Sequence, residues 1–192
     1  MNKYKKISSS KIILGIDPGT IRTGYGIVEY DFNIFKPITY GIIKLTTFNN
    51  ISLKLECIYN ELDKIIKTFS PDEFSIETAF YGKNVQSALK IGYARGVSML
   101  AAVHNQLEVN EYSPREIKKS LVGTGAASKE QVNFMVKSIL NLRKKEIQFD
   151  ASDALATAIC HAFHSNSLSN ISSYKKNDWK NFIETFPERV IQ

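Results

Sequence analysis

Apolar and β-branched residues form three short runs in the first quarter of the chain. Residues 12–16 are almost continuously apolar and stop at Asp17-Pro18-Gly19, which predicts a central strand that is buried on both faces. Residues 23–30 and 38–45 are rich in aromatic and β-branched side chains and are separated by a short polar stretch, as is typical of strands. We expect the three strands to form an antiparallel meander with Asp17 at the end of the first.

From Ser52 the apolar residues recur every three or four positions until Ser70-Pro71, which predicts an amphipathic helix that ends at the proline. Residues 74–77 and 107–112 are expected to be short strands, and residues 83–105 a long helix. Within that helix Ala88, Gly92 and Gly96 form a stripe of small residues. Each internal glycine costs ~1 kcal/mol relative to alanine, so we expect something to approach this stripe closely.

Ser113 and Ser128 each begin a capping-box sequence, which predicts helix starts at Pro114 and Lys129. A last helix is expected over about 150–164. Three strands, a helix, a strand, a helix, a strand and further helices are the order of an α/β domain with a mixed sheet.

The composition agrees with one folded domain. The chain has 192 residues, of which 43% are hydrophobic and 23% charged, so it is too apolar for a disordered protein and too short for a large multidomain enzyme. No apolar run approaches the ~18 residues of a membrane span, and the polar, Lys-rich start does not resemble a signal peptide. We therefore expect a cytoplasmic protein without membrane contact. Cys57 and Cys160 lie in apolar helical contexts and are expected to be buried thiols without chemistry.

The net charge of +6 is unevenly distributed. Four lysines and no acid occur in residues 1–11, which we expect to form a flexible basic arm. Residues 83–146 carry 11 basic and 5 acidic side chains, and acidic residues dominate before them and return after them. This pattern suits a polyanion that is held by one surface and acted on by another. We expect the folded domain to span 12–166 and a polar tail to occupy 167–192.

Four acidic residues occupy positions where they could meet. Asp17 and Glu77 close two predicted strands, and Asp150 and Asp153 stand at i and i+3 on one face of a helix. Clustered carboxylates repel one another and imply bound cations, for which oxygen ligands favour Mg²⁺ or Mn²⁺. Taken one at a time, each acid also fits an ordinary turn, strand end or helix cap.

Several segments in order along the chain resemble the bacterial RuvC Holliday junction resolvases. Asp17 lies in the first of these segments, Glu77 in the second and the pair Asp150 and Asp153 in the last. The matching segments are residues 13–20 with 23–26, 76–84 with 87–90 and 94–96, 111–114, 122–125 with 129–132, and 150–156. The resemblance covers about residues 12–164.

The resemblance implies an RNase H-like fold, with a mixed five-stranded sheet flanked by helices. It also implies a homodimer that cuts two strands of a four-way DNA junction by symmetric paired nicks, in recombination and repair. Asp17, Glu77, Asp150 and Asp153 would be the catalytic and metal-binding residues. Two Mg²⁺ ions per site are implied, with Mn²⁺ as a substitute, and a two-metal site activates water for phosphodiester hydrolysis. The family works beside the RuvA and RuvB branch-migration proteins, which are therefore expected partners.

The resemblance also suggests DNA contacts. An aromatic residue after Glu77, best matched by Phe80, would stack on junction bases. The expected phosphate contacts are Lys83, Arg115, Lys118, Lys119 and Lys129. Arg95 is a further phosphate contact or instead an interface or ion-pair residue, and we expect His161 to pack on the last helix rather than transfer protons.

Three questions stay open at this point. The small-residue stripe of Ala88, Gly92 and Gly96 fits a dimer interface or close packing on the protein's own sheet. The chain could be a junction-binding scaffold that does not cleave. The chain could also be an ATP-binding module, because the loop from Asp17 to Thr20 resembles one in sugar-kinase and actin-like ATPases. A second phosphate loop is not recognisable, however.

Overall fold

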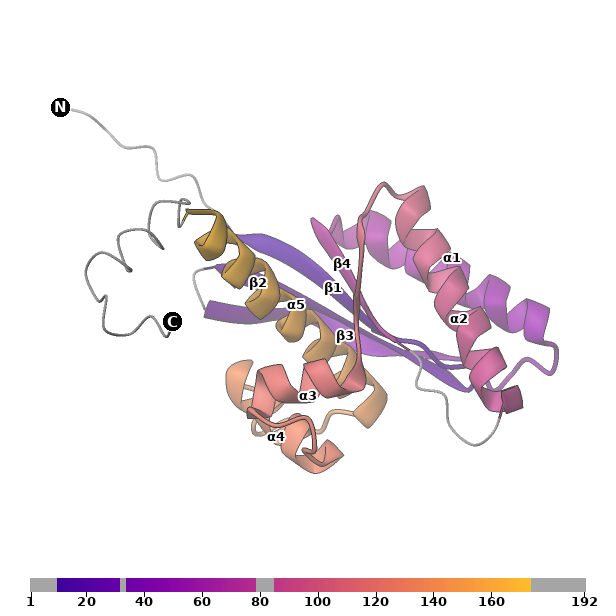
Figure 1. Cartoon of the computed structure of the whole chain (residues 1–192). Helices are drawn as coiled ribbons and strands as arrows, with labels where there is room; N and C mark the ends of the chain where they lie inside the picture. The colour runs from indigo at the N-terminus through magenta and orange to yellow at the C-terminus, as the bar shows by residue number, and fades with distance from the viewer. Residues whose placement is uncertain (1–9, 32–33, 79–84, 174–192) are drawn as a thin grey trace, which may run out of the picture.

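One five-stranded sheet organises the molecule, as a computed structural model shows (Figure 1). The structure describes residues 10–31, 34–78 and 85–173, with the backbone alone for 166–173. The strands are β1 (Lys11–Asp17), β2 (Arg22–Asp31), β3 (Ile34–Lys44), β4 (Glu73–Glu77) and β5 (Val109–Tyr112). The helices are α1 (Ile51–Phe69), α2 (Val85–His104), α3 (Pro114–Val122), α4 (Lys129–Ile139) and α5 (Phe149–Ser173).

The sheet is mixed, with the strand order β3-β2-β1-β4-β5. The pairs β1–β2 and β2–β3 are antiparallel, which confirms the predicted meander, whereas β1–β4 and β4–β5 are parallel. β3 begins four residues before the expected Ile38 and includes Pro37, which is tolerated because β3 is an edge strand. Since β1, β4 and β5 run in the same direction, their carboxyl ends lie at one edge of the sheet.

The helices form two layers, one on each face of the sheet (Figure 1). Side chains of α1 and α2 build a core with the face of the sheet that carries Leu14, Ile16 and Phe74. Side chains of α3, α4 and α5 build a second core with the face that carries Ile13 and Val28. The alternation of Ile13 and Leu14 between the two cores confirms that β1 is buried on both sides.

α5 lies unusually close to the sheet because glycine and alanine meet at the contact. A Cβ added at Gly15 would be 2.2 Å from the carbonyl oxygen of Ala154 and 2.9 Å from the Cβ of Ala158. A larger residue at Gly15 would therefore clash with backbone. The close contact fixes the height of α5 above β1, and with it the position of the first turn of α5.

Both predicted capping boxes are present, at Ser113 with Glu116 and at Ser128 with Gln131. α5 extends to Ser173, so the expected end near His164 was wrong. Ser and Asn residues dominate this last part of α5 and weaken the helix signal in the sequence, although the helical backbone continues through them. No helix in the described part of the chain has the combined length and hydropathy needed to cross a membrane.

The small-residue stripe of α2 does not pack on the protein's own sheet. A Cβ at Gly92 or Gly96 would meet nothing within 4 Å, which excludes the alternative of close packing against the sheet and leaves the dimer interface as a prediction. α2 instead buries its opposite side, through Ala94, Ser98 and Ala101.

Candidate active site

Three of the four singled-out carboxylates line one cavity. Asp17 and Glu77 end the neighbouring parallel strands β1 and β4, and Asp153 lies in the first turns of α5, which packs across those strands. Together they line a cavity of about 210 Å³. Segments separated by up to 136 positions in the sequence thus place their acids at the same sheet edge.

Asp150 lies on the other side of this cluster. It lines a second, larger cavity of about 610 Å³, and its Oδ2 lies 3.8 Å from Nη1 of Arg22 at the start of β2. It remains part of the same electrostatic group, because its charge raises the pKa values of Asp17 and Asp153. The first turns of α5 therefore carry one acid toward each cavity.

Burial and mutual repulsion disfavour the charged forms of the clustered acids. Burial, followed by repulsion from the neighbouring carboxylates, holds the pKa of Asp17 well above its usual value. The same two effects, with Asp153 as the repelling neighbour, raise the pKa of Glu77 to about 7. Burial raises the pKa of Asp153 against the opposing effect of Lys129. A nearby positive charge would therefore favour the ionised forms of these clustered acids.

Two lysines reach the cavity from the helical layer. Lys129, at the start of α4, places its Nζ 3.6 Å from Oδ2 of Asp153, and this acid raises the pKa of Lys129. Lys118 of α3 lines the same cavity and lowers the pKa of Glu77. Both lie where a phosphate could be held beside the carboxylates.

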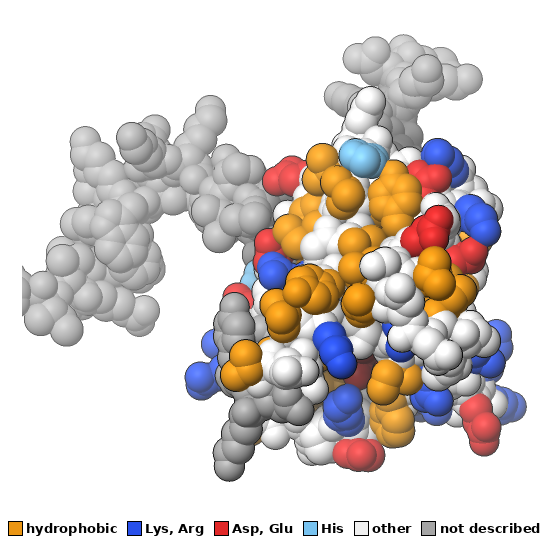
Figure 2. All heavy atoms as spheres, turned by 90° about the vertical axis from the view of Figure 1, so that its right-hand side faces the viewer, with side chains coloured by type: hydrophobic (Ala, Val, Ile, Leu, Met, Phe, Trp, Pro, Cys, Tyr) orange, Lys and Arg blue, Asp and Glu red, His pale blue; other side chains and the backbone are white. Residues whose placement is uncertain are grey.

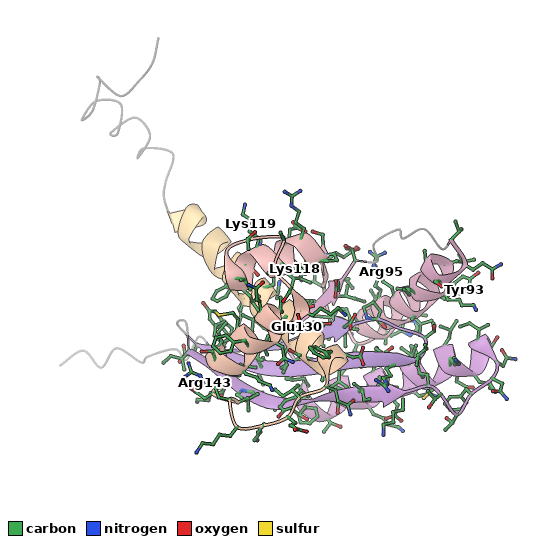
Figure 3. All side chains as sticks on the ribbon, turned by 90° about the horizontal axis from the view of Figure 1, so that it is seen from below. Tyr93, Arg95, Lys118, Lys119, Glu130 and Arg143 are labelled. Carbon is green, nitrogen blue, oxygen red and sulfur yellow. The ribbon has the colours of Figure 1, made fainter. Side chains whose placement is uncertain are left out.

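The other basic residues singled out from the sequence lie elsewhere. Lys119 is exposed on α3 beside Lys118, and Figure 3 shows both on this helix. Arg115 is exposed and its side chain covers Gly125 in the α3–α4 connection. Arg95 forms an ion pair with Glu111, which confirms the ion-pair alternative for this residue. Phe80 and Lys83 lie outside the described residues.

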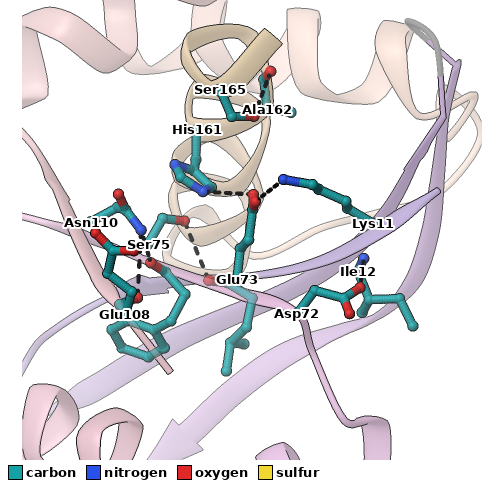
Figure 4. Close-up of polar contacts among 12 residues, drawn as sticks. Lys11, Ile12, Asp72, Glu73, Ser75, Glu108, Asn110, His161, Ala162 and Ser165 are labelled. Carbon is teal, nitrogen blue, oxygen red and sulfur yellow. Dashed lines mark hydrogen bonds and ion pairs between the residues drawn. The ribbon is translucent and has the colours of Figure 1, made fainter. Parts of the chain in front are cut away.

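His161 packs within α5, as expected, and does not line the carboxylate cavity. Its side chain is buried, with Nε2 2.8 Å from Oε2 of Glu73 and Nδ1 2.7 Å from the hydroxyl of Tyr112. Glu73 also pairs with Lys11 (Figure 4). Because Glu73 begins β4 and Glu77 ends it, this network anchors α5 at the far side of the strand from the acids.

The chemistry of the carboxylate cavity fits divalent cations. Its charged donors are carboxylate oxygens, which Mg²⁺ and Mn²⁺ prefer, and the raised pKa values of Asp17 and Glu77 show that added positive charge would stabilise their ionised forms. Among the described residues no three acidic, histidine or cysteine side chains are already arranged around a single point. Binding an ion would therefore require side-chain rotations that draw the acids together.

The sequence matches a family model over residues 13–161, that of the crossover junction endodeoxyribonuclease RuvC. The chain belongs to the RuvC family. It is 49% identical over 157 residues to the RuvC of Clostridioides difficile, with 82% of this chain and 92% of the relative covered. It is 42% identical over 186 residues to the RuvC of Chloroherpeton thalassium, with 94% of this chain and 100% of the relative covered.

Solved structures agree with this membership. RuvC of Thermus thermophilus in complex with a Holliday junction substrate superposes with a TM-score of 0.76 at 29% identity, covering 81% of this chain and 94% of that one. The predicted RNase H-like fold is thereby confirmed, with its mixed five-stranded sheet and flanking helices. As a RuvC-family protein, the chain is a nuclease. Nucleases with this fold generally depend on divalent metal ions for their activity.

Sequence reasoning missed one basic residue at the carboxylate cluster, Arg22. The predicted meander could have located this residue in the sequence. If β2 runs antiparallel to β1, the start of β2 must lie at the same sheet edge as Asp17. Arg22 is the first residue of β2 and forms an ion pair with Asp150. The register of the meander therefore carried more information about the site than the charge count did.

Proposed function

We propose that this RuvC-family protein resolves four-way (Holliday) DNA junctions by paired symmetric nicks in homologous recombination and repair. The observation that carries the proposal is the cavity lined by Asp17, Glu77 and Asp153 together with Lys118 and Lys129. Acids for metal ions and lysines for phosphates are what phosphodiester hydrolysis requires at one place. The Thermus relative solved with a Holliday junction supports the choice of substrate.

Asp17, Glu77, Asp150 and Asp153 are the proposed catalytic, metal-binding residues, with two Mg²⁺ ions per site and Mn²⁺ as a substitute. Bound metal would activate a water molecule and stabilise the leaving oxygen. The chain's own residues hold the other components: Lys118 and Lys129 hold the phosphate backbone next to the acids. The close contact of α5 with β1 fixes the helix that carries Asp150 and Asp153.

The proposed enzyme is a homodimer formed through α2. The side of α2 that faces away from the sheet carries exposed apolar residues at helical spacing around the two open glycines, Gly92 and Gly96. These residues are Val85, Leu89, Tyr93, Leu100 and Val103. Hydrophobic side chains form a band along this side of the molecule (Figure 2). Such a face is typical of a protein interface, and a two-fold dimer matches the symmetry of a junction.

The remaining assignments follow from the family and the substrate. RuvA and RuvB are the proposed partners, and the cytoplasm is the proposed compartment because the substrate is DNA. We further propose the division of the chain into a basic arm (1–11), the nuclease domain (12–166) and a polar tail (167–192), with the arm adding positive charge for DNA.

The test is cleavage of a mobile four-way junction in the presence of Mg²⁺, beside a linear duplex of the same sequence. Wild type should produce symmetric paired nicks in the junction alone, Asp150→Asn should lose them, and EDTA should abolish them. Asp31→Asn, at the other end of β2, is the matched control and should cleave normally. Binding to the junction without any cleavage in Mg²⁺ or Mn²⁺ would favour a non-cleaving scaffold instead.

A further inference from the structure

A second cavity with a volume of about 610 Å³ lies beside Asp150, on the side away from Lys118 and Lys129. Three separate parts of the chain enclose it: the β1–β2 connection with the first residue of β2, the start of α1, and the first turns of α2. Its volume lies in the range of sites that hold small ligands. Apart from Asp150, the cleavage chemistry proposed above uses none of its lining residues.

The charged side chains that line this cavity favour an anion. Arg22, Lys54 and Lys90 each come from a different element. Asp150 is the one acid among the described lining residues, and Arg22 already lies 3.8 Å from it. Figure 2 shows Lys and Arg side chains on both sides of a hollow in the lower half of this face, with an acidic side chain inside it.

The backbone around the cavity adds to the positive potential. The amino ends of α1 and α2 both contribute lining residues, Ile51 from the first and Ser87 from the second, and helix amino ends attract anions. Lys54 donates a hydrogen bond from Nζ to the carbonyl oxygen of Thr20 at 3.0 Å. This bond ties the loop that follows Asp17 to α1, so the shape of the cavity depends on the same loop as the carboxylate cluster.

The uncharged lining points to a phosphate rather than a base. Its large apolar members are Ile21, Ile51 and Ile91, and none of the described lining residues is aromatic. Proteins that hold unpaired bases usually stack them on aromatic rings. The described lining residues can therefore recognise the charge of a phosphodiester, with aliphatic walls against the sugar, but they include no stacking surface for a base.

We propose that this cavity is a phosphate subsite for the cleaved strand, binding a backbone phosphate next to the one that is cut through Arg22, Lys54 and Lys90. The proposal rests on the function proposed above. Asp150 borders this cavity, whereas Asp17, Glu77 and Asp153 line the one that contains the lysines. The strand would then cross the acids with one phosphate held on each side, which fixes the scissile bond between two anchored points.

The first test is the salt dependence of junction binding, measured in EDTA so that no cleavage occurs. Each lost phosphate contact reduces the slope of log K against log salt by about 0.9. Lys54→Gln with Lys90→Gln removes two cations from one phosphate and should therefore reduce the slope by up to about 0.9 for each bound protomer, and Lys90→Gln alone should reduce it by less. Lys64→Gln with Lys67→Gln removes the same charge further along α1 and should leave the slope unchanged.

The second test locates the phosphate. Single neutral methylphosphonates are placed along the strand on both sides of the cleavage point, and junction binding by wild type and the double variant is compared. One position, adjacent to the cut, should weaken binding by wild type and have no further effect on Lys54→Gln with Lys90→Gln. Equal losses in both proteins at every position would overturn the subsite.

The outcomes separate this inference from the proposed function. If wild type neither binds nor nicks a junction, the function itself fails. If wild type does both and the double variant keeps the slope of its control, only the subsite fails. ATP at millimolar concentration tests a free nucleotide as the other source of phosphate. The proposal would be overturned if ATP binding depended on Lys54 and Lys90 while the salt slope of junction binding stayed unchanged in the double variant. The cavity would then be assigned to a free nucleotide.

Discussion

Gly24 of β2 lies directly against the backbone of Asp150: a Cβ added at Gly24 would be 2.0 Å from the carbonyl oxygen of Asp150. No side chain fits between the strand and the first turn of α5. Because Asp153 is one turn further along the same helix, the distance of both acids from Asp17 depends on this contact as well as on the one at Gly15.

Gly24→Ala should therefore impair catalysis more than folding. The methyl group must push the first turn of α5 away from β2, at a cost of about 1–3 kcal/mol in the free energy of unfolding. A displacement of about 1 Å at catalytic groups is enough for a loss of about 100-fold in rate. Junction cleavage and urea unfolding of the same preparation measure the two effects.

Gly41→Ala is the matched control, because the atoms nearest to its added Cβ belong to the outer end of the Tyr25 side chain, with the hydroxyl oxygen at 2.8 Å. That side chain can move without displacing backbone. A Gly24→Ala protein as active as Gly41→Ala would show that α5 is not held at its working height by this contact.

Metal removal should make the protein less stable as the pH rises. The pKa of Glu77 is raised to about 7 by burial and by Asp153, so the folded state holds a proton that the unfolded chain releases near its usual value of 4.5. In EDTA the free energy of unfolding should fall between pH 4.5 and pH 7, by up to about 3 kcal/mol for this group. Mg²⁺ should restore stability at pH 8, as thermal unfolding would show.

Glu77→Gln isolates this effect. In EDTA at pH 8 the variant should be more stable than wild type, since it has no charge to bury, and Mg²⁺ should stabilise it less. Lower stability of Glu77→Gln than of wild type under these conditions would mean that Glu77 makes a favourable contact in the metal-free protein.

Local sequence patterns were enough to predict most of the helices and strands. The buried run of β1 and the capping boxes at Ser113 and Ser128 are decided by residues close in sequence, and they were predicted correctly. The end of α5 was not, because Ser and Asn residues after His164 have weak helix propensity and the backbone nevertheless continues helically to Ser173.

The parts of the site that follow from the order and direction of the strands could be predicted from the sequence. The parts that depend on side-chain packing could not. Asp17 and Glu77 meet because parallel strands end at one edge, a consequence of the predicted mixed sheet. The division of the acids between two cavities, with Asp150 beside Arg22, depends on how α5 is rotated above the sheet. Hydrophobic periodicity gives the buried face of a helix, but it does not give the direction of a single carboxylate on that face.

Lys118 and Lys119 are adjacent in sequence and should differ in function. Lys118 lines the carboxylate cavity and lowers the pKa of Glu77, whereas Lys119 is exposed and is not among the described lining residues. Lys118→Gln should reduce the rate of junction cleavage at saturating protein by at least about tenfold, because electrostatic stabilisation next to the reacting phosphate is lost.

Lys119→Gln is its control and should change the cleavage rate less than about twofold, with any effect confined to binding at high salt. Equal losses of cleavage rate in the two variants would mean that the cavity does not define the reacting position. An unchanged salt slope when both lysines are replaced would remove them from the set of phosphate contacts.

A charge on the open side of α2 should dissociate the proposed dimer. Leu100 is 46% exposed and lies with Gly96 on the apolar side of α2. Leu100→Glu would bury an unpaired carboxylate in the interface, which should weaken dimerisation by at least about 100-fold. Sedimentation measures the association. Leu53→Glu, at a similarly exposed leucine of α1, should remain dimeric, and a dimeric Leu100→Glu would place the interface elsewhere.

The pair of half-buried Glu73 and buried His161 should stabilise the fold above the acid range. The hydrogen bond from His161 is the main cause that lowers the pKa of Glu73 to about 2. The ionised carboxylate therefore stabilises the folded protein above its usual pKa of 4.5, and this contribution is lost as the pH falls toward 2. Glu73→Gln should lower the free energy of unfolding at pH 6, and the difference from wild type should shrink steadily below pH 4.5. Glu29→Gln, at a surface pair with Lys36, should show no such convergence; a pH-independent cost of Glu73→Gln would assign the effect to packing rather than to charge.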